Sequence, residues 1–247
     1  MKRIIILFFA VMSYLFGLGA IVYYAGFLSE IGVPKSINGG ARSSTGIAIT
    51  VNLLLLATFG IQHSVMARKG FKKWLKRWVP SSAERSVYIF MSSAVTLLIC
   101  RYWIPLPYEI YDLRESVWEN LFWGLYGLGW FFGLFSTFLI DHFDLFGLKQ
   151  AWYQWKGKTE FRYQFKTPLL YRIVRHPIYL GWLMIHWFTP HLTAGHILYA
   201  SVITLYIYIA VYFEERDLVN EFGNTYREYQ ESTPKLIPVL GQTKKKG

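Results

Sequence analysis

Long blocks of apolar residues constrain this 247-residue chain more than any other feature of its sequence. The blocks run over residues 4–28, 46–66, 87–104, 117–140 and 178–213, and the last is interrupted near residues 190–195. About 20 apolar residues in a row are needed for a helix to cross a bilayer. We therefore expect an all-α, polytopic transmembrane bundle with four single spans and a C-terminal helical hairpin, forming one membrane domain over residues 1–247.

Two details refine the expected bundle. The first arm of the hairpin, residues 178–189, is short for a complete span, since a helix rises only about 1.5 Å per residue. It is therefore expected to tilt or to line a cavity. Small residues let helices approach closely in lipid. The candidates for such contacts are Gly17, Gly19, Gly124, Gly127, Gly129 and Gly133.

The charges between the apolar blocks predict the orientation of the chain. Residues 67–86 hold seven basic and one acidic side chain, a net charge of +6. Residues 141–177 hold seven basic and three acidic ones, a net of +4, whereas residues 105–116 carry three acidic and one basic, a net of −2. The positive-inside rule then places both termini and the two basic stretches in the cytoplasm, as in a protein of the bacterial inner membrane. The overall charge of +11 therefore reflects topology, and no nucleic-acid partner is expected.

Residues 67–86 also interleave their basic side chains with large apolar ones, namely Phe71, Trp74, Leu75 and Trp78. This pattern predicts an amphipathic helix that lies on the anionic cytoplasmic leaflet of the bilayer. Residues 80–82 are expected to end this helix, and Glu84 is expected to begin the next one.

Three groups of polar residues lie at the cytoplasmic ends of the expected spans. Ionisable groups at membrane depth are costly, so they are candidates for function. The groups are His63; Asp141, His142 and Asp144; and Arg175 and His176 together with Glu214 and Glu215. Their common membrane face suggests one site. A structural role remains the alternative for each, since interfacial side chains also anchor helices and carboxylates cap them.

Two stretches of the C-terminal third carry a resemblance to a known family. Residues 175–182 read RHPIYLGW and resemble the R-H-P-x-Y-x-G-W motif of the isoprenylcysteine carboxyl methyltransferase family. Residues 214–229 resemble its second motif, E-E-x-x-L-x-x-x-F-G-x-x-Y-x-x-Y. Residues 62–68, 84–88 and 141–148 are similar to elements of the related NnrU group, so the resemblance extends over nearly the whole chain.

The resemblance implies a methyltransferase that uses S-adenosylmethionine, bound within residues of about 160–240. By resemblance, the cofactor contacts are Tyr171, His176, Pro177, Ile178, Tyr179 and Glu214. Glu214 suits the amino group or a ribose hydroxyl of this cofactor. Arg175 or a backbone N–H at a helix N-terminus suits its carboxylate, and the ring of Tyr179 or Trp182 suits its sulfonium cation.

The methyl acceptor is indicated by a departure from the family pattern. Relatives that methylate a prenylated carboxylate carry an arginine one turn before the first glutamate, where this chain has Ala210. A small, neutral, apolar acceptor that arrives through the bilayer is therefore favoured, and the resemblance implies methanethiol, converted to dimethyl sulfide. Thiol methylation needs the thiolate, hence a base. We predict that His142 is this base, positioned by Asp141 or Asp144, with His63 as the second choice and no metal ion at the site.

Other functions remain open at this point. The acceptor is alternatively a lipid, a phenol or sulfide. The NnrU group also includes haem-binding isomerases of the ζ-carotene type, for which His63 and a second histidine would be iron ligands. A non-enzymatic role as a transporter or assembly factor is the third class, although the sequence has no inverted repeat of the kind that many transporters show.

Overall fold

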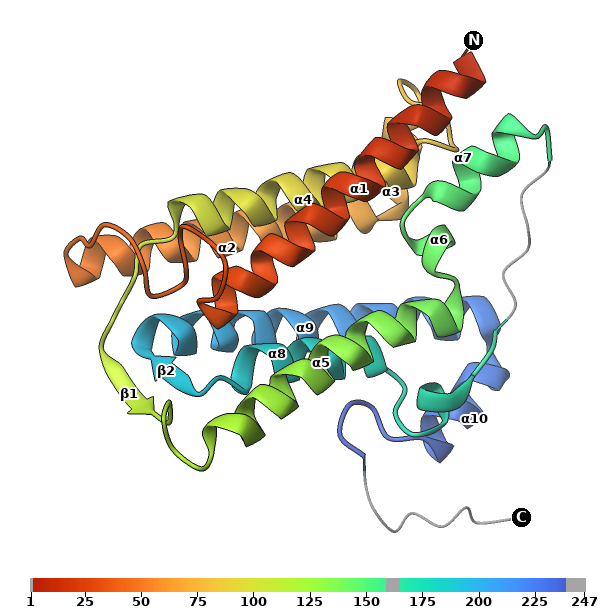
Figure 1. Cartoon of the computed structure of the whole chain (residues 1–247). Coiled ribbons are helices and arrows are strands. Elements are labelled where there is room, and N and C mark those ends of the chain that lie inside the picture. Colours follow the sequence, from red (N-terminus) through yellow and green to blue (C-terminus); the bar gives the residue numbers. More distant parts are fainter. Residues whose placement is uncertain (1, 159–164, 239–247) are drawn as a thin grey trace. The chain divides into compact units, whose positions relative to one another are not determined.

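The computed structural model describes residues 2–158 and 165–238, and within these ranges its elements of regular secondary structure are helices and one pair of short strands (Figure 1). The expected all-α, polytopic membrane protein is confirmed. Residues 160–164 and 239–240 of the predicted cofactor-binding part lie outside the described residues.

Among the described residues, four helices are long and apolar enough to cross a membrane. They are α1 (Lys2–Ser29), α2 (Thr45–Ala67), α5 (Glu119–Ile140) and α9 (Ala194–Phe222). The third apolar block forms α4 (Glu84–Tyr102), whose ends carry Glu84, Arg85 and Arg101 and make it less apolar than the four. The first arm of the hairpin forms α8 (Pro177–Trp187), whose 11 residues extend only about 16 Å, so it is as short as expected.

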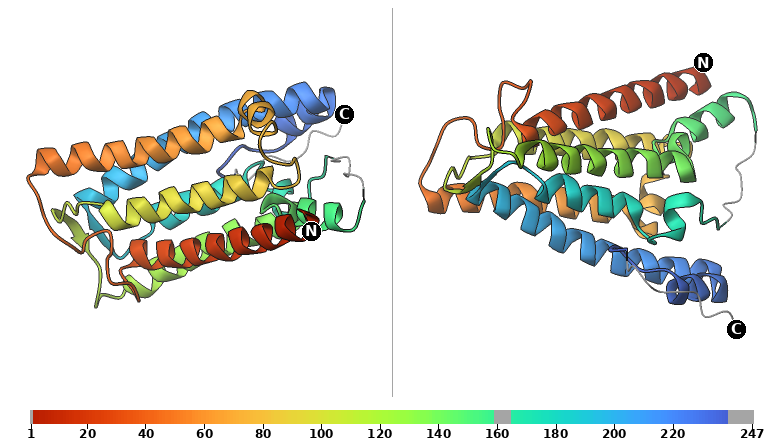
Figure 2. Two further views of the ribbon diagram at one scale, coloured as in Figure 1. Left: turned by 90° about the horizontal axis from the view of Figure 1, so that it is seen from above. Right: turned by 60° about the horizontal axis from the view of Figure 1, so that its bottom comes forward.

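The chain packs as two compact units, and the prediction of a single membrane domain stays a prediction. The first unit comprises the described residues of 1–112, 141–162 and 191–199. In it, α1 and α2 both pack along α4, and α7 (Leu148–Trp155) packs on α1 (Figures 1 and 2). The short helix α6 (His142–Leu145) precedes α7. A Cβ on Gly17 would lie 3.0 Å from Ile89 Cγ2, so this glycine provides the expected close approach of α1 and α4.

The helix predicted between residue 67 and residues 80–82 is shorter in the structure. Only α3 (Lys69–Leu75) is helical, and turns follow it. Trp74 and Trp78 are exposed, while the amines of Lys72 and Lys76 lie 3.7 and 3.3 Å from the carboxylate of Glu84. Glu84 begins α4, as predicted, and its pairing with two lysines of the preceding segment joins α3 to α4.

The second unit comprises the described residues of 113–140, 163–190 and 200–247, and its main contact is between α5 and α8. A Cβ on Gly181 would lie 2.6 Å from both the carbonyl oxygen of Gly129 and the amide nitrogen of Gly133. These glycines let the two backbones touch. By contrast, a Cβ on Gly124 or Gly127, or on Gly19 of the first unit, would meet nothing within 4 Å, so the described structure leaves room for a side chain at these predicted glycines. The unit also contains η1 (Leu169–Arg172) and α10 (Asn224–Ser232).

The strands were not predicted from the sequence. β1 (Glu109–Asp112) and β2 (His191–Thr193) pair antiparallel in the first unit, with Asp112 opposite His191 and Glu109 opposite Thr193. A bulge between Glu109 and Tyr111 shifts the register. The strand β2 occupies the interruption of the last apolar block, where a turn was expected, and α9 follows it directly.

Candidate functional site

The start of α8 is fixed by proline and by the C-terminal segment of the chain. Pro177 is the first residue of α8, where its missing N–H costs nothing because the first turn of a helix leaves its N–H groups without intrahelical partners. Just before it, the backbone N–H groups of Arg175 and His176 donate to the carbonyls of Pro234 and Lys235, at 2.9 and 3.1 Å. The motif residues are therefore held by the segment that follows α10.

A buried carboxylate, Glu215, lies at the centre of the C-terminal motif residues. Its Oε1 accepts from Nε of Arg175 at 2.8 Å and from Nε2 of His176 at 3.1 Å, and its Oε2 lies 3.4 Å from the amine of Lys235. Arg175 also donates to the carbonyls of Gln230, at 2.7 Å, and Thr233. This network joins α8, α9 and the C-terminal segment. It pairs Arg175 and His176 with a glutamate of α9 that belongs to the same group of polar residues in the sequence-based prediction.

Sequence reasoning named Glu214 as the cofactor contact, whereas the buried member of the pair is Glu215. The reason is the spacing of four along α9. Ile203, Ile207, Val211 and Glu215 are all buried and lie on one stripe of the helix. Glu214 lies next to that stripe and is exposed. The spacing of four residues is visible in the sequence, and it is the signal that distinguishes the buried Glu215 from the exposed Glu214.

The other predicted cofactor contacts lie around this network in the second unit. Tyr171 is buried and donates to the carbonyl of Ser136 at 3.5 Å, and its own carbonyl accepts from the hydroxyl of Tyr229. Burial, together with the charge of nearby Glu214, raises the pKa of the Tyr171 phenol. The ring of Tyr179 lies 5.7 Å from that of His176. Pro177 is buried and Ile178 is half-buried in the first turn of α8, and the role of each residue in cofactor binding stays a prediction.

The aromatic residues of the second motif have a packing role. Phe165 lies 5.4 Å from Phe222, 5.6 Å from Tyr226 and 5.3 Å from Tyr229, measured between ring centroids. These rings join α9, α10 and the segment before η1. Between the two helices, Gly223 has a φ of +59°, a backbone conformation that favours glycine. The motif therefore also sets the turn that leads back to Arg175 through the C-terminal segment.

The Asp141–Asp144 segment lies in the first unit, and its two carboxylates organise the chain locally. Asp141 caps α6 by accepting from the backbone N–H of Asp144 at 3.1 Å, and it pairs with the amine of Lys149. This bond raises the pKa of Lys149. Asp144 accepts from the side-chain amide of Gln150 at 3.1 Å. Both carboxylates thus fix the fold around His142, and a direct contact of either one with the imidazole stays a prediction.

His142 itself is only 3% exposed, and it bonds with a residue that sequence reasoning missed. The hydroxyl of Tyr14 on α1 lies 3.0 Å from its Nε2, and the ring of Phe146 packs 4.6 Å from the imidazole. Burial lowers the pKa of His142, against the smaller, opposite effect of the Asp141 charge. A neutral imidazole is the form that accepts a proton, so this environment suits a general base. Tyr14 carries one of the few polar groups of the first apolar block, which is the signal that could have pointed to it.

His63, the second choice for the base, is held between α2 and α4 of the first unit. Its Nε2 lies 2.5 Å from the hydroxyl of Tyr88, its Nδ1 lies 3.2 Å from the hydroxyl of Ser92, and Phe59 stacks on its ring at 5.1 Å. Both ring nitrogens thus have hydroxyl partners. This arrangement suits a residue that joins two helices, which was the structural alternative.

The helical membrane architecture carries two motifs, at the start of α8 and the end of α9, that resemble those of membrane methyltransferases, and two similar proteins are methyltransferases too. Methanethiol S-methyltransferase 2 of Bradyrhizobium diazoefficiens is 46% identical over 238 residues, which are 96% of this chain and 92% of that protein. The methanethiol S-methyltransferase of Mycobacterium tuberculosis is 44% identical over 96% of this chain and 98% of its own length. The chain therefore belongs to the methanethiol S-methyltransferase family. Nurim of Bos taurus is more distant, at 31% identity over 78% of each chain, and no protein-family model and no solved structure matches.

Proposed function

We propose that this integral membrane protein transfers a methyl group from S-adenosylmethionine to methanethiol and releases dimethyl sulfide. The observation that carries the proposal is the similarity over 96% of the chain to proteins of that name. We further propose that the protein lies in a bacterial inner membrane with both termini in the cytoplasm, as its basic stretches indicate. The polar cofactor then enters from the cytosol and the apolar thiol from the bilayer.

The residues at the start of α8 and the end of α9 suit S-adenosylmethionine as the cofactor. When bound, it would supply a methyl group on a sulfonium centre, for transfer to the thiolate sulfur with S-adenosylhomocysteine as the neutral leaving group. Glu214 is an exposed carboxylate whose charge reaches buried Tyr171, and it suits the amino group or a ribose hydroxyl. The ring of Tyr179 suits the sulfonium cation. Arg175 and His176 hold the start of α8 through Glu215, and a direct bond from Arg175 to the cofactor carboxylate stays a prediction.

The residue proposed to take the thiol proton is His142. Alkanethiols titrate above the value of about 8.5 for cysteine, so at neutral pH most of the acceptor is protonated and unreactive. The pKa of His142 is lowered by burial, so its ring is neutral and able to receive the proton. The Tyr14 hydroxyl, 3.0 Å from Nε2, is proposed to fix the ring. Asp141 and Asp144 act on this step by holding α6 in place.

A labelled-methyl assay tests the proposed function. The purified full chain in detergent is incubated with S-adenosylmethionine that carries a trideuterated methyl group, with methanethiol, and the headspace is analysed by mass spectrometry. We expect dimethyl sulfide heavier by three mass units, formed only when both reactants are present. Binding of the cofactor without any labelled dimethyl sulfide would refute methanethiol as the acceptor. Parallel reactions with sulfide, a phenol and a prenylated cysteine then determine which of these acceptors the protein uses.

A further inference from the structure

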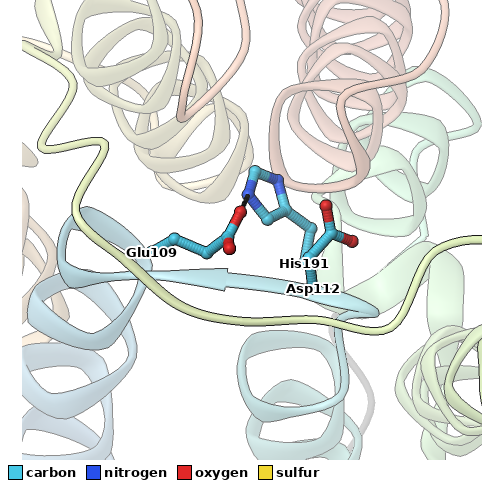
Figure 3. Close-up of side chains that lie close together, drawn as sticks. All are labelled: Glu109, Asp112 and His191. Atoms are coloured by element: carbon cyan, nitrogen blue, oxygen red, sulfur yellow. Dashed lines mark ion pairs between the residues drawn. The ribbon is translucent and has the colours of Figure 1, made fainter.

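A second cluster of ionisable residues lies on the strand pair of the first unit, and the proposed methyl transfer does not use it. Asp112 and His191 face each other across the antiparallel pair, where opposite side chains share one face. Glu109 is three residues before Asp112, a spacing that would place it on the other face of a regular strand. The bulge between Glu109 and Tyr111 returns it to the face of Asp112 and His191 (Figure 3). Ligand atoms of the three side chains lie within 4.8 Å of one another.

The orientation of His191 is set by a carboxylate behind it. Oε1 of Glu30 lies 3.0 Å from Nδ1 of His191, and a carboxylate only accepts, so Nδ1 carries the hydrogen. Glu30 is itself held by the amide of Asn38 at 2.8 Å and by the hydroxyl of Ser36 at 3.3 Å. In the neutral ring, the lone pair of Nε2 is then directed away from Glu30. Oε2 of Glu109 lies on that side, 3.6 Å from Nε2.

A lone pair and a carboxylate oxygen that face each other repel unless a cation lies between them. Their separation of 3.6 Å is close to the roughly 3.4 Å between two ligands that each lie about 2.1 Å from a tetrahedral metal ion. A histidine that binds a metal usually donates its other ring N–H to a carboxylate, which is the position that Glu30 takes here. One imidazole and two carboxylates form a donor set that suits zinc and similar divalent ions.

We propose that Glu109, Asp112 and His191 bind a divalent transition-metal ion, with Zn²⁺ as the best match, and that Glu30 orients His191 for it. The proposal goes beyond methyl transfer and does not depend on it. The four residues come from the connections between α1 and α2, between α4 and α5, and between α8 and α9. A bound ion would therefore join three connections that are far apart in the sequence and stabilise the first unit.

The experiment uses the full chain with its affinity tag removed and its metals stripped by a chelator. Zn²⁺ binding is measured by calorimetry for the wild type, Asp112→Asn, His191→Gln and the control Glu115→Gln. The control changes an exposed carboxylate close by in the sequence but outside the cluster. We expect the wild type and the Glu115→Gln control to bind one Zn²⁺ per chain. Asp112→Asn and His191→Gln should bind it at least tenfold more weakly. Added Zn²⁺ should raise the thermal midpoint of the wild type and the control only.

Two results would overturn the metal site. The first is Zn²⁺ binding that is equally strong in all four proteins, since the metal would then bind elsewhere. The second is a wild type that takes up no Zn²⁺, which would leave a proton on Nε2 as the cation between His191 and Glu109. The thermal midpoints of the metal-free proteins show whether a variant has lost its fold. If Asp112→Asn and His191→Gln unfold at the same temperature as the metal-free wild type, their weak Zn²⁺ binding is due to the lost metal ligand.

Discussion

His176 in the second unit and His142 in the first are both buried, but they are held by different groups. His176 donates to the carboxylate of Glu215, which Arg175 shares, whereas His142 bonds with the phenol of Tyr14. A carboxylate only accepts, so it fixes both the tautomer and the orientation of the ring that donates to it. A phenol both donates and accepts, and it leaves a buried imidazole neutral. The contacts of His176 therefore position the start of α8, whereas those of His142 suit the proton transfer proposed for it.

The largest effect is expected from His142→Gln, which removes the proposed base. Turnover should fall by about 10²- to 10⁴-fold, the usual contribution of general base catalysis, with cofactor affinity unchanged. Because burial lowers the pKa of His142, the wild type should lose activity only at a pH lower than that at which an ordinary histidine becomes protonated. The variant should instead gain activity steadily with rising pH, as free thiolate forms. Rates measured between pH 5 and 9 compare the two.

Glu215→Gln should have the next largest effect, on stability. The change removes the charge that Arg175 and His176 share in a buried network, and breaking a buried pair in this way costs about 3–5 kcal/mol. The thermal midpoint of the purified protein should fall sharply, and activity with it. If the variant unfolds like the wild type, the network does not hold the start of α8, and the contrast between the two histidines fails.

Gly181→Ala tests whether cofactor binding depends on the close packing of α8, the helix that follows His176. The new Cβ would lie 2.6 Å from backbone atoms of Gly129 and Gly133, so α8 has to move away from α5. Overpacking of this kind costs about 1–3 kcal/mol and should weaken cofactor binding. Gly127→Ala is the matched control, because a Cβ there meets nothing within 4 Å. Equal thermal midpoints and equal cofactor affinities for the two variants would contradict the close packing.

Glu214→Gln separates the outward glutamate from the inward one. Glu214 is exposed, so its replacement should leave the thermal midpoint unchanged, unlike that of Glu215. If its carboxylate binds the cofactor, the loss of one charge-assisted hydrogen bond should weaken S-adenosylmethionine binding by about tenfold or more. Calorimetric titration measures this. An unchanged dissociation constant would remove Glu214 from the proposed contacts.

Tyr14→Phe should have the smallest effect. It removes one hydrogen bond to His142, which is worth about 0.5–1.5 kcal/mol, and leaves the aromatic packing of Tyr14 against Phe146 in place. We expect turnover to fall about two- to tenfold, with the cofactor affinity unchanged. A loss as large as that of His142→Gln would mean that Tyr14, rather than His142, handles the proton.

The sequence predicted the membrane helices well because their signal is local. Twenty apolar residues in a row define a span without reference to any partner, and α1, α2 and α5 follow their blocks closely, while α9 continues past its block to Phe222. The strand pair was missed for the opposite reason. β1 and β2 are only four and three residues long, and they form because residues 109–112 and 191–193 pair across a separation of about 80 residues. Such a pairing leaves no periodic pattern in a single sequence.

The candidate site was predicted in part. The motifs named Arg175 and His176 and grouped them with Glu214 and Glu215, and the structure joins the first two through the buried carboxylate of Glu215. The resemblance named Glu214 as a cofactor contact, which stays a prediction, and the burial of the neighbouring Glu215 follows from the helical stripe on which it lies. Tyr14 lies 128 residues from His142 in the chain, so only the packing of the first unit brings the two together.

The most direct test of the account compares His142→Gln with His176→Gln in single-turnover reactions, with thermal midpoints and cofactor binding measured on the same preparations. We predict that His142→Gln keeps its stability and its cofactor affinity but loses at least 10²-fold in the rate of dimethyl sulfide formation at neutral pH. His176→Gln should lose stability and affinity and keep the pH dependence of the wild type. Full turnover in His142→Gln, or a changed pH dependence in His176→Gln alone, would contradict the assignment of the base to His142.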